Sequence, residues 1–373
     1  MKTTMIIIIT DNENARIDIH NQRARFLEDH CNLHIEEMDE LGKFKLSLML
    51  TLLVFVLAAC GGTSETKKEE NVDGATKTET VEITDAHGTI EVPVNPEKVV
   101  ALDNRTFETL AAWDIDLVAA PIGLLPAESP YASDKDIADV GMHFEPNLEA
   151  IAGVDPDVVI VGQRFADYYE DIKKLVPEAA VIDLNIEIPE DSGTPGEILV
   201  KGLTDTTLTL GKIFDKNTEA EAIVADLDKS IEDAKAAYNG KDTIMSVIVS
   251  GGDIGFSAPV TGRVFGPMYD IFGWVPALEV EKKTGDHEGD EVSVEAIAES
   301  NPDWLFVLDR DAPLGDAEGA VPAEDVIDNA PALQKTTAVT KEQIVYAPKD
   351  TYLNESIQTY TEFFNSVTEA LAK

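Results

Sequence analysis

The sequence contains one pattern twice: EPNLEAIAGVDPDVVIVGQR at Glu145–Arg164 and EVSVEAIAESNPDWLFVLDR at Glu291–Arg310. Aligned without gaps, the two copies are identical at nine of twenty positions. In each copy an amphipathic stretch is followed by Pro-Asp and then by an uninterrupted apolar run. Because proline cannot continue a helix and holds the preceding residue extended, each copy predicts a short helix, a turn and a strand.

The apolar run of each copy is typical of a parallel strand. VVIVG (158–162) and WLFVL (304–308) lack the polar alternation of a strand with one face in water, so both faces should be covered. Because the copies begin 146 residues apart, they predict two lobes of similar design. The fold class that follows is α/β, with two Rossmann-like lobes, each built on a central and mostly parallel sheet.

The boundaries of the lobes follow from the segments around the repeat. We expect an N-terminal lobe at residues 81–204 and a C-terminal lobe at residues 241–373. Between them, residues 203–238 carry helical periodicity with one glycine and no proline. We therefore predict that one long helix, residues 205–240, joins the lobes.

The N-terminal part resembles an export signal. Fourteen uncharged residues, LSLMLTLLVFVLAA, occupy Leu46–Ala59 after two lysines and before Cys60. A bilayer span needs ~20 apolar residues, so this run is short for a membrane helix and fits the core of a signal peptide. We predict a lipoprotein signal peptide at 43–59, with a lipid on Cys60 that anchors the protein to the extracytoplasmic side of the cell membrane. A buried core helix that ends in a chance cysteine is the alternative.

The segments on either side of this signal differ in character. Residues 60–80 are polar and rich in threonine, lysine and glutamate, which predicts a flexible tether. Residues 1–42 form a mixed, acidic stretch that does not fit a signal peptide. Either translation begins near Met38 or Leu41, or the stretch is a real extension, and the sequence leaves both open.

The composition excludes several classes of partner and activity. The formal net charge is -42 and is spread along the chain, so we expect no nucleic-acid partner. The sequence lacks GxSxG, HExxH, CxxC and phosphate-loop motifs, so we expect a binding protein without an intrinsic cofactor rather than an enzyme. Three histidines follow Cys60 and do not cluster, which disfavours free zinc or manganese as a ligand. We also expect a monomer.

Arginine is scarce after the signal peptide, and two of the arginines follow predicted strands. Only four follow Cys60: Arg105, Arg164, Arg263 and Arg310. Arg164 and Arg310 come directly after the strand of each copy, and ligands of open α/β sheets bind beyond the carboxyl ends of strands. A planar guanidinium suits oxygen anions, so we predict that both face a cleft between the lobes. The alternative is that they pair with Asp167 and Asp311 on a solvated rim.

Two further residues are candidates for the same cleft. His287 lies in the loop TGDHEGDE ahead of the second copy, and Tyr352 follows the apolar segment IVYAP. An imidazole and a phenolate can complete an iron coordination sphere that a chelator leaves open. For His287 the alternative is an exposed loop histidine without a ligand.

The ordered set of segments resembles a known family. The lipoprotein signal, the tether, the two copies, the expected connecting helix and VFGPMYDIFGWVPA (264–277) are together similar to siderophore-binding lipoproteins of iron ABC importers. These belong to the class III periplasmic-binding-protein family, and the likeness is strongest to the petrobactin and catecholate branch. The resemblance covers essentially all of Val81–Lys373.

The resemblance implies a ligand and the residues that bind it. The ligand would be a ferric siderophore of catecholate or petrobactin type, with haem, cobalamin or another metal chelate as the alternative. By matching positions, Arg164, Arg263 and Arg310 would line the pocket and neutralise the anionic complex. Arg105 is an additional arginine near the expected cleft.

The resemblance also implies contacts to the iron and to a transporter. His287 and Tyr352 match positions that reach the metal when the siderophore leaves sites open. Glu149 and Glu295, at equivalent places in the two copies, match acidic residues that dock on an ABC permease, which works with its ATPase. Their alternative role is to solvate or cap their helices. After Tyr352 the chain reads LNESIQTY (353–360) where relatives have a glycine-rich turn, so we expect a reshaped loop.

Overall fold

The computed structural model describes most of the chain beyond the tether. The described ranges are 79–189, 191–280, 284–314 and 321–372. All of them belong to one compact unit, Thr76–Lys373. Within these ranges no helix has the length and apolar character that crossing a membrane requires. The predictions for the extension 1–42, the signal 43–59, Cys60 and nearly all of the tether 60–80 lie outside the described residues.

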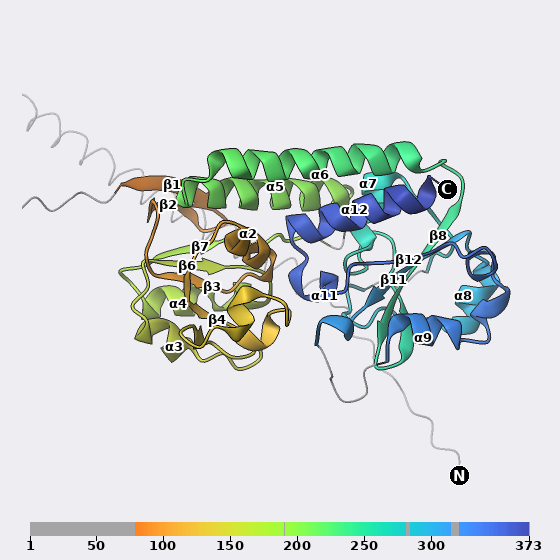
Figure 1. Ribbon diagram of the computed structural model, residues 1–373, viewed down its shortest axis with the longest axis horizontal. Coiled ribbons are helices and arrows are strands. Elements are labelled where there is room, and N and C mark those ends of the chain that lie inside the picture. The colour runs from red at the N-terminus through yellow and green to blue at the C-terminus, as the bar shows by residue number, and fades with distance from the viewer. Residues whose placement is uncertain (1–78, 190, 281–283, 315–320, 373) are drawn as a thin grey trace, which may run out of the picture. The chain divides into compact units, whose positions relative to one another are not determined.

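Five parallel strands form the sheet of the N-terminal lobe (Figure 1). In spatial order they are β5 (Ala138–Asp139), β4 (Leu117–Ala120), β3 (Val99–Ala101), β6 (Val158–Val161) and β7 (Ala180–Asp183). The helices of this lobe are α2 (Phe107–Ala112), α3 (Leu148–Gly153) and α4 (Tyr169–Leu175). An antiparallel hairpin, β1 (Thr80–Asp85) and β2 (Gly88–Pro93), precedes the sheet.

The C-terminal lobe repeats this design. Its parallel strands are, in spatial order, β10 (Val275–Pro276), β8 (Thr243–Ser250), β11 (Trp304–Asp309) and β12 (Ile344–Tyr346), and β9 (Asp253–Phe256) pairs antiparallel with β8. Its helices are α7 (Gly266–Phe272), α8 (Val294–Ser300), α9 (Ala323–Asp328), α10 (Thr337–Thr340), α11 (Thr351–Asn354) and α12 (Ile357–Leu371). The predicted fold class, two α/β lobes with mostly parallel sheets, is confirmed.

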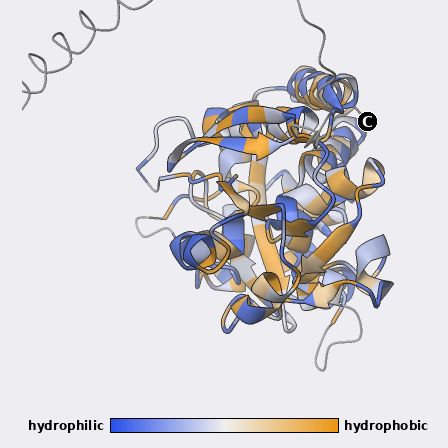
Figure 2. Cartoon of the chain, turned by 90° about the vertical axis from the view of Figure 1, so that its left-hand side faces the viewer, coloured by the Kyte–Doolittle hydropathy of each residue, from blue (hydrophilic) through white to orange (hydrophobic). Residues whose placement is uncertain are grey.

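Both sheets are covered on both faces, as the apolar runs predict. Along β6, Val158 and Ile160 pack into one core cluster and Val159 and Val161 into another. Residues of β11 alternate in the same way between two clusters of the C-terminal lobe. Figure 2 shows the apolar strands inside, with more hydrophilic segments around them. Burial on both faces explains why neither strand carries polar alternation.

The two copies of the repeat also share their anchoring contacts. Asp157, in the first Pro-Asp turn, accepts a hydrogen bond from the main-chain N–H of Lys98, next to the start of β3 (2.8 Å). Asp303, in the second, accepts one from the N–H of Thr243 at the start of β8 (2.9 Å). Each aspartate thus fixes the strand of its copy against the neighbouring strand of its sheet, which accounts for the shared Pro-Asp.

The connection between the lobes differs from the prediction. Two helices, α5 (Pro195–Ile213) and α6 (Asn217–Ala237), replace the single helix expected at 205–240. The chain reverses at Asp215, which has a left-handed φ of 50° and interrupts the helical hydrogen bonds. Gly211 lets the two helices approach closely, because a Cβ there would lie 2.7 Å from the Cβ of Ala220. Periodicity alone did not reveal the break, since both helices carry an apolar face.

Helix α12 completes the helical layer. It packs along α6, and Figure 1 shows α5, α6 and α12 side by side. Its first turn contacts the N-terminal lobe, because Ser356 and Thr359 donate hydrogen bonds to Glu108 of α2. The segment from α11 to the start of α12 therefore belongs to the C-terminal lobe in sequence but binds both lobes.

Candidate functional site

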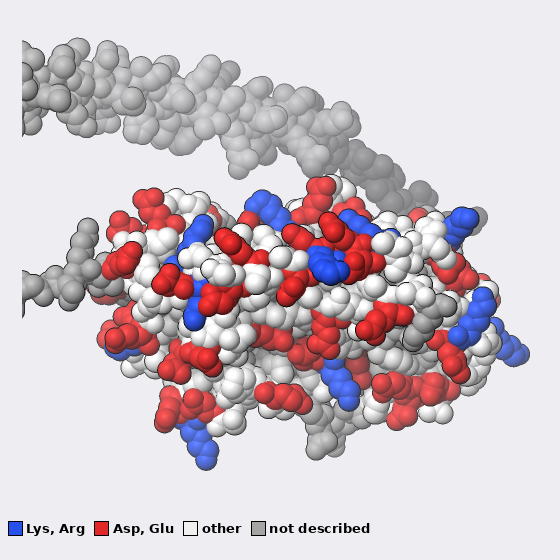
Figure 3. Space-filling view, turned by 45° about the horizontal axis from the view of Figure 1, so that its top comes forward, with Lys and Arg blue, Asp and Glu red and all other residues white. Residues whose placement is uncertain are grey.

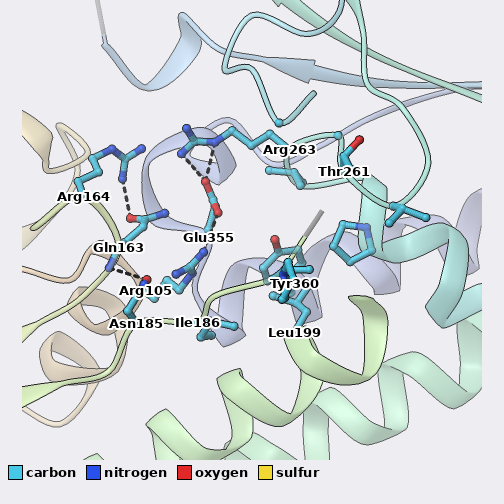
Figure 4. A pocket seen from close by; sticks show the side chains of 17 residues that line it. Arg105, Gln163, Arg164, Asn185, Ile186, Leu199, Thr261, Arg263, Glu355 and Tyr360 are labelled. Atoms are coloured by element: carbon cyan, nitrogen blue, oxygen red, sulfur yellow. Dashed lines mark hydrogen bonds and ion pairs between the residues drawn. The ribbon is translucent and has the colours of Figure 1, made fainter. Parts of the chain in front are cut away.

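A cavity of about 490 Å³ lies where the two lobes meet. Its wall includes Arg105 and Arg164 from the N-terminal lobe. Arg263 and Glu355 from the C-terminal lobe face them, and Leu199 of α5 adds apolar surface. Figure 4 shows the three guanidinium groups gathered around the Glu355 carboxylate. The cavity wall thus carries charged side chains from both lobes.

Strand ends place three of the four predicted arginines. Arg164 lies in a 3-10 helix, Gln163–Tyr168, that follows β6 directly. Arg310 follows the last residue of β11, and Arg105 lies in the 3-10 helix Asn104–Thr106 after β3. These positions are the carboxyl ends of parallel strands, where ligands of such sheets bind. Arg263 is different, because a loop between β9 and α7 carries it.

The ring of Tyr352 is the point on which three arginines converge. The guanidinium carbons of Arg263, Arg310 and Arg164 lie 4.4, 5.4 and 5.9 Å from its centroid. The main-chain oxygen of Tyr352 accepts hydrogen bonds from Arg164 Nη2 (3.1 Å) and Arg263 Nη2 (3.3 Å). The structure therefore brings these four predicted residues together. Tyr352 is nearly buried and lies on α11, not in an open loop.

Glu355 is a site residue that the sequence analysis missed. Its Oε1 accepts hydrogen bonds from Nε (2.8 Å) and Nη2 of Arg263, and its Oε2 accepts one from Arg105 Nη2 (3.3 Å). Only 5% of the residue is exposed. Burial opposes its ionisation, but Arg263 and Arg105 hold the pKa of the carboxyl below its ordinary value. Glu355 is therefore a buried carboxylate, and it lies in the segment expected to be reshaped.

The positive charge of the cluster exceeds this one carboxylate. Burial and the neighbouring Arg263 lower the pKa of Arg164, yet an arginine stays charged at any physiological pH. Burial also opposes the charge of Arg263, but Glu355 beside it raises the pKa of that guanidinium. Nε and Nη1 of Arg105 and Nε of Arg310 are buried without a hydrogen-bond partner among the described residues. Buried donors of this kind usually have a partner, so these three stand out as unsatisfied within the part of the chain that the structure describes.

The backbone that holds these side chains is strained at several points. Val260 and Val264 flank Arg263 with φ values of 77° and 64°, in a region that β-branched residues seldom adopt. Gln163 and Glu355 have φ values of 43° and 46°. Strained residues cluster at binding sites because the surrounding structure holds functional groups there at some expense of stability. Here one strained residue, Glu355, carries a charged group itself, and the others lie within three residues of Arg164 or Arg263.

His287 does not join the cluster. Its side chain is 51% exposed, and its Nε2 lies 3.8 Å from Oε1 of Glu288. That same oxygen lies 3.8 Å from Nη1 of Arg310. The Glu288 carboxylate therefore lies between His287 and Arg310. It stays a prediction that His287 and Tyr352 reach the iron of a bound siderophore. Within the described ranges, no group of three or more histidine, cysteine or acidic residues could hold a metal ion.

His143 is a second histidine near the arginines, and the sequence analysis gave it no role. Burial, together with the charges of Arg164 and Arg263, lowers the pKa of its imidazole, which favours the neutral form. Its Nδ1 is buried and has no hydrogen-bond partner in the part of the chain that the structure describes. The adjoining Phe144 is 76% exposed, so this loop presents apolar surface beside the charges.

Glu149 and Glu295 occupy equivalent exposed places on α3 and α8. The side-chain caps of these helices are Asn147 and Ser293, which accept hydrogen bonds from the N–H groups of Ala150 and Ala296. The two glutamates are therefore free of a capping hydrogen bond to their own helices. They remain candidates for contact with another protein.

The surface outside the cavity is acidic. Figure 3 shows acidic side chains over the whole visible face, with basic side chains scattered between them. On this face the acidic side chains are spread out and do not gather at one place. The arginine cluster is thus a local positive region in a strongly negative protein.

A comparison with protein families decides the class of the chain. A family model described as periplasmic binding protein matches residues 99–351, more than half of the chain. The chain belongs to the periplasmic binding protein family. It is a substrate-binding protein, and the prediction that it is no enzyme is confirmed.

Individual relatives are similar to this chain over more than two thirds of its length. The petrobactin-binding protein YclQ of Bacillus subtilis is 29% identical over 338 residues, 89% of this chain and 99% of that protein. Its crystal structure matches with a TM-score of 0.65 and 26% identity, over 79% of this chain and 99% of that one. The ferric-anguibactin-binding protein FatB of Vibrio anguillarum is 26% identical over 258 residues, 69% of this chain and 76% of that protein.

Proposed function

We propose that this chain captures a ferric siderophore, of catecholate or petrobactin type, between its two lobes and delivers it to an ABC permease. The observation that carries the proposal is the convergence of Arg105, Arg164 and Arg263 on one cavity between the lobes. Tyr352 and Arg310 are not among the residues that line it, but the Tyr352 ring packs against Arg263, which does, and Arg310 lies over the same ring. The siderophore is the transported cargo, and no intrinsic cofactor is needed.

The charge of the cluster favours an anionic, oxygen-rich ligand. A protein with a net charge of -42 repels anions at long range, so binding one requires a desolvated positive pocket. Guanidinium groups in such a pocket form strong, charge-assisted hydrogen bonds to catecholate and carboxylate oxygens. The cavity of about 490 Å³ lies within the range usual for small-molecule sites. Two relatives, the petrobactin-binding protein YclQ and the ferric-anguibactin-binding protein FatB, support the same ligand class.

The export signal supports a place at the cell surface. We propose that Cys60 carries the lipid that anchors the mature protein, which faces the extracytoplasmic side. Replacement Cys60→Ala should release the protein from the membrane fraction into the medium or periplasm. Unchanged membrane association of that variant would refute the anchor.

Equilibrium dialysis of the wild-type protein against a panel of chelates tests the ligand class. The panel contains ferric catecholate and mixed catecholate–carboxylate complexes, a ferric hydroxamate, haem and cobalamin. We expect sub-micromolar dissociation constants for the anionic catecholate complexes and much weaker binding of the ferric hydroxamate. Tightest binding of haem or cobalamin would instead establish the alternative ligand class.

A further inference from the structure

The Glu355 carboxylate stands among the groups that should receive an anionic ligand. It lines the cavity and binds Arg263 and Arg105, and both its oxygens are engaged. Figure 4 shows it between these two arginines, with Arg164 near it. A negative charge at the centre of an anion site opposes a ligand of the same sign. Its presence therefore needs an explanation in terms of the ligand.

The backbone around Glu355 is fixed in place. The residue follows α11 in a left-handed conformation and precedes Ser356, whose Oγ caps α12 by accepting the N–H of Thr359 (3.0 Å). The Ser356 hydroxyl also donates to Glu108 of the other lobe. Asn354 and Ser356 are buried on either side. The backbone of Glu355 is thus held on both sides, and its carboxylate is held by the hydrogen bonds from Arg263 and Arg105.

The arrangement sets the charge that the site offers. Arg105, Arg164 and Arg263 supply three positive charges to the cavity wall, and Glu355 removes one. The other buried carboxyl beside them, Asp103, accepts the main-chain N–H of Arg105 (3.0 Å) and lies behind the wall, outside the cavity lining. Glu355 is thus the carboxylate in that lining that a ligand would meet.

We propose that Glu355 discriminates between ligands by charge, disfavouring each ferric chelate in proportion to its net negative charge. The site is thereby tuned toward chelates of low charge, such as a ferric bis-catecholate, which carries one negative charge. A ferric tris-catecholate carries three. This inference rests on the proposed function and specifies its ligand. Because Coulomb energy scales with the product of the charges, removing the charge of Glu355 should increase the affinity for the tris-catecholate most.

The test measures dissociation constants of two synthetic probes by equilibrium dialysis with radiolabelled iron. One probe is the ferric complex of a bis-catecholamide and the other that of a tris-catecholamide. With Glu355→Gln, we expect binding of the bis-catecholate to tighten by roughly tenfold and that of the tris-catecholate by at least tenfold more. Glu355→Asp, which keeps the charge, should retain the wild-type ratio of the two constants.

Two controls separate charge from packing and folding. Glu362→Gln removes one exposed carboxylate from α12 and should change neither constant, since it lies outside the cavity lining. Combining Glu355→Gln with Arg105→Gln restores the net charge and should restore the wild-type ratio, even if the single variant folds poorly. Thermal unfolding confirms that each measured variant is folded.

The outcomes distinguish this inference from the proposed function. Equal tightening of both probes in Glu355→Gln, or loss of the ratio in Glu355→Asp, would overturn charge discrimination and leave ferric-chelate binding in place. If the wild-type protein binds neither probe, both the inference and the proposed function fail. A ratio that shifts with Glu355→Gln and returns with the double variant supports the inference.

Discussion

The two copies of the repeat end in arginines that meet different surroundings. In the N-terminal lobe, Arg164 donates to the neutral main-chain oxygen of Tyr352. In the C-terminal lobe, Arg310 donates to Ser250 Oγ (2.8 Å) and lies 3.6 Å from Asp311 of its own lobe. The repeat determines where each guanidinium stands, and the residues outside it determine how much positive charge stays available. Arg310 thus lies within ion-pair distance of Asp311, but Asp311 is buried and not on a solvated rim, and Arg164 has other partners.

The sharpest test of this difference compares Arg164→Gln with Arg310→Gln. Losing a buried charge partner of a ligand costs about 2–5 kcal/mol, so Arg164→Gln should weaken binding of a ferric catecholate by about thirtyfold or more. Arg310→Gln should weaken it by less than tenfold, because Asp311 already offsets part of its charge. Equilibrium dialysis of both variants measures the two ratios. An equal loss of affinity in the two variants would mean that the residues around Arg164 and Arg310 do not change what each contributes to binding.

The cores under the two copies should respond alike. Ile151 and Ile297 are equivalent positions, and both are fully buried. Replacing either by alanine leaves a cavity, and such changes typically cost about 2–5 kcal/mol of unfolding free energy. Urea unfolding of Ile151→Ala and Ile297→Ala should show losses within this range for each. A loss below about 1 kcal/mol in one lobe would show that its copy is loosely packed.

Two buried carboxyls near the site should respond to pH with opposite signs. Arg263 and Arg105 overcome burial and lower the pKa of Glu355 from its ordinary 4.5, so its stabilising effect is present above pH 4.5 and is lost as the pH falls through the lowered value. Burial raises the pKa of Asp103 from its ordinary 3.8, so its contribution is present below pH 3.8 and is lost as the pH rises through the raised value.

Unfolding free energies at several pH values, relative to Glu355→Gln and Asp103→Asn, measure the two contributions. The wild-type advantage over Glu355→Gln should shrink as the pH falls below 4.5. The advantage over Asp103→Asn should shrink as the pH rises above 3.8. Slopes of the same sign would contradict the ion pairing of Glu355.

The smallest effect concerns the two exposed glutamates. Each of Glu149 and Glu295 would make one surface ion pair with a permease, worth about 0.2–1 kcal/mol. Single reversals, Glu149→Lys or Glu295→Lys, should therefore slow uptake of labelled ferric siderophore only mildly and by similar amounts. The double reversal should abolish uptake while ligand affinity stays unchanged. Wild-type uptake by the double variant would leave the glutamates with a purely structural role.

The sequence allowed prediction of features that depend on local pattern. The uninterrupted apolar runs identified β6 and β11 as strands covered on both faces, and the repeat identified the two lobes. The strand-end rule placed both arginines after these strands; Arg164 lines the cavity, whereas Arg310 lies over the Tyr352 ring and is not among the lining residues. The break between α5 and α6 escaped because an aspartate, Asp215, and not a glycine or proline, takes the left-handed conformation there.

Features that depend on distant contacts were beyond local pattern. Glu355 binds Arg263 and Arg105, which lie 92 and 250 residues away along the chain, and nothing in LNESIQTY announces those partners. His143 gained its place near the arginines in the same way. The departure from a glycine-rich turn was the one available signal that the loop after Tyr352 was unusual.

Guanidinium groups from both lobes should bind one anionic ferric chelate together. The most direct measurement is the dissociation constant of a ferric catecholate for the double variant Arg164→Gln with Arg263→Gln, one change in each lobe, against wild type. With about 2 kcal/mol or more lost at each position, affinity should fall by roughly a thousandfold. Binding within twofold of wild type, by a folded variant, would contradict the account.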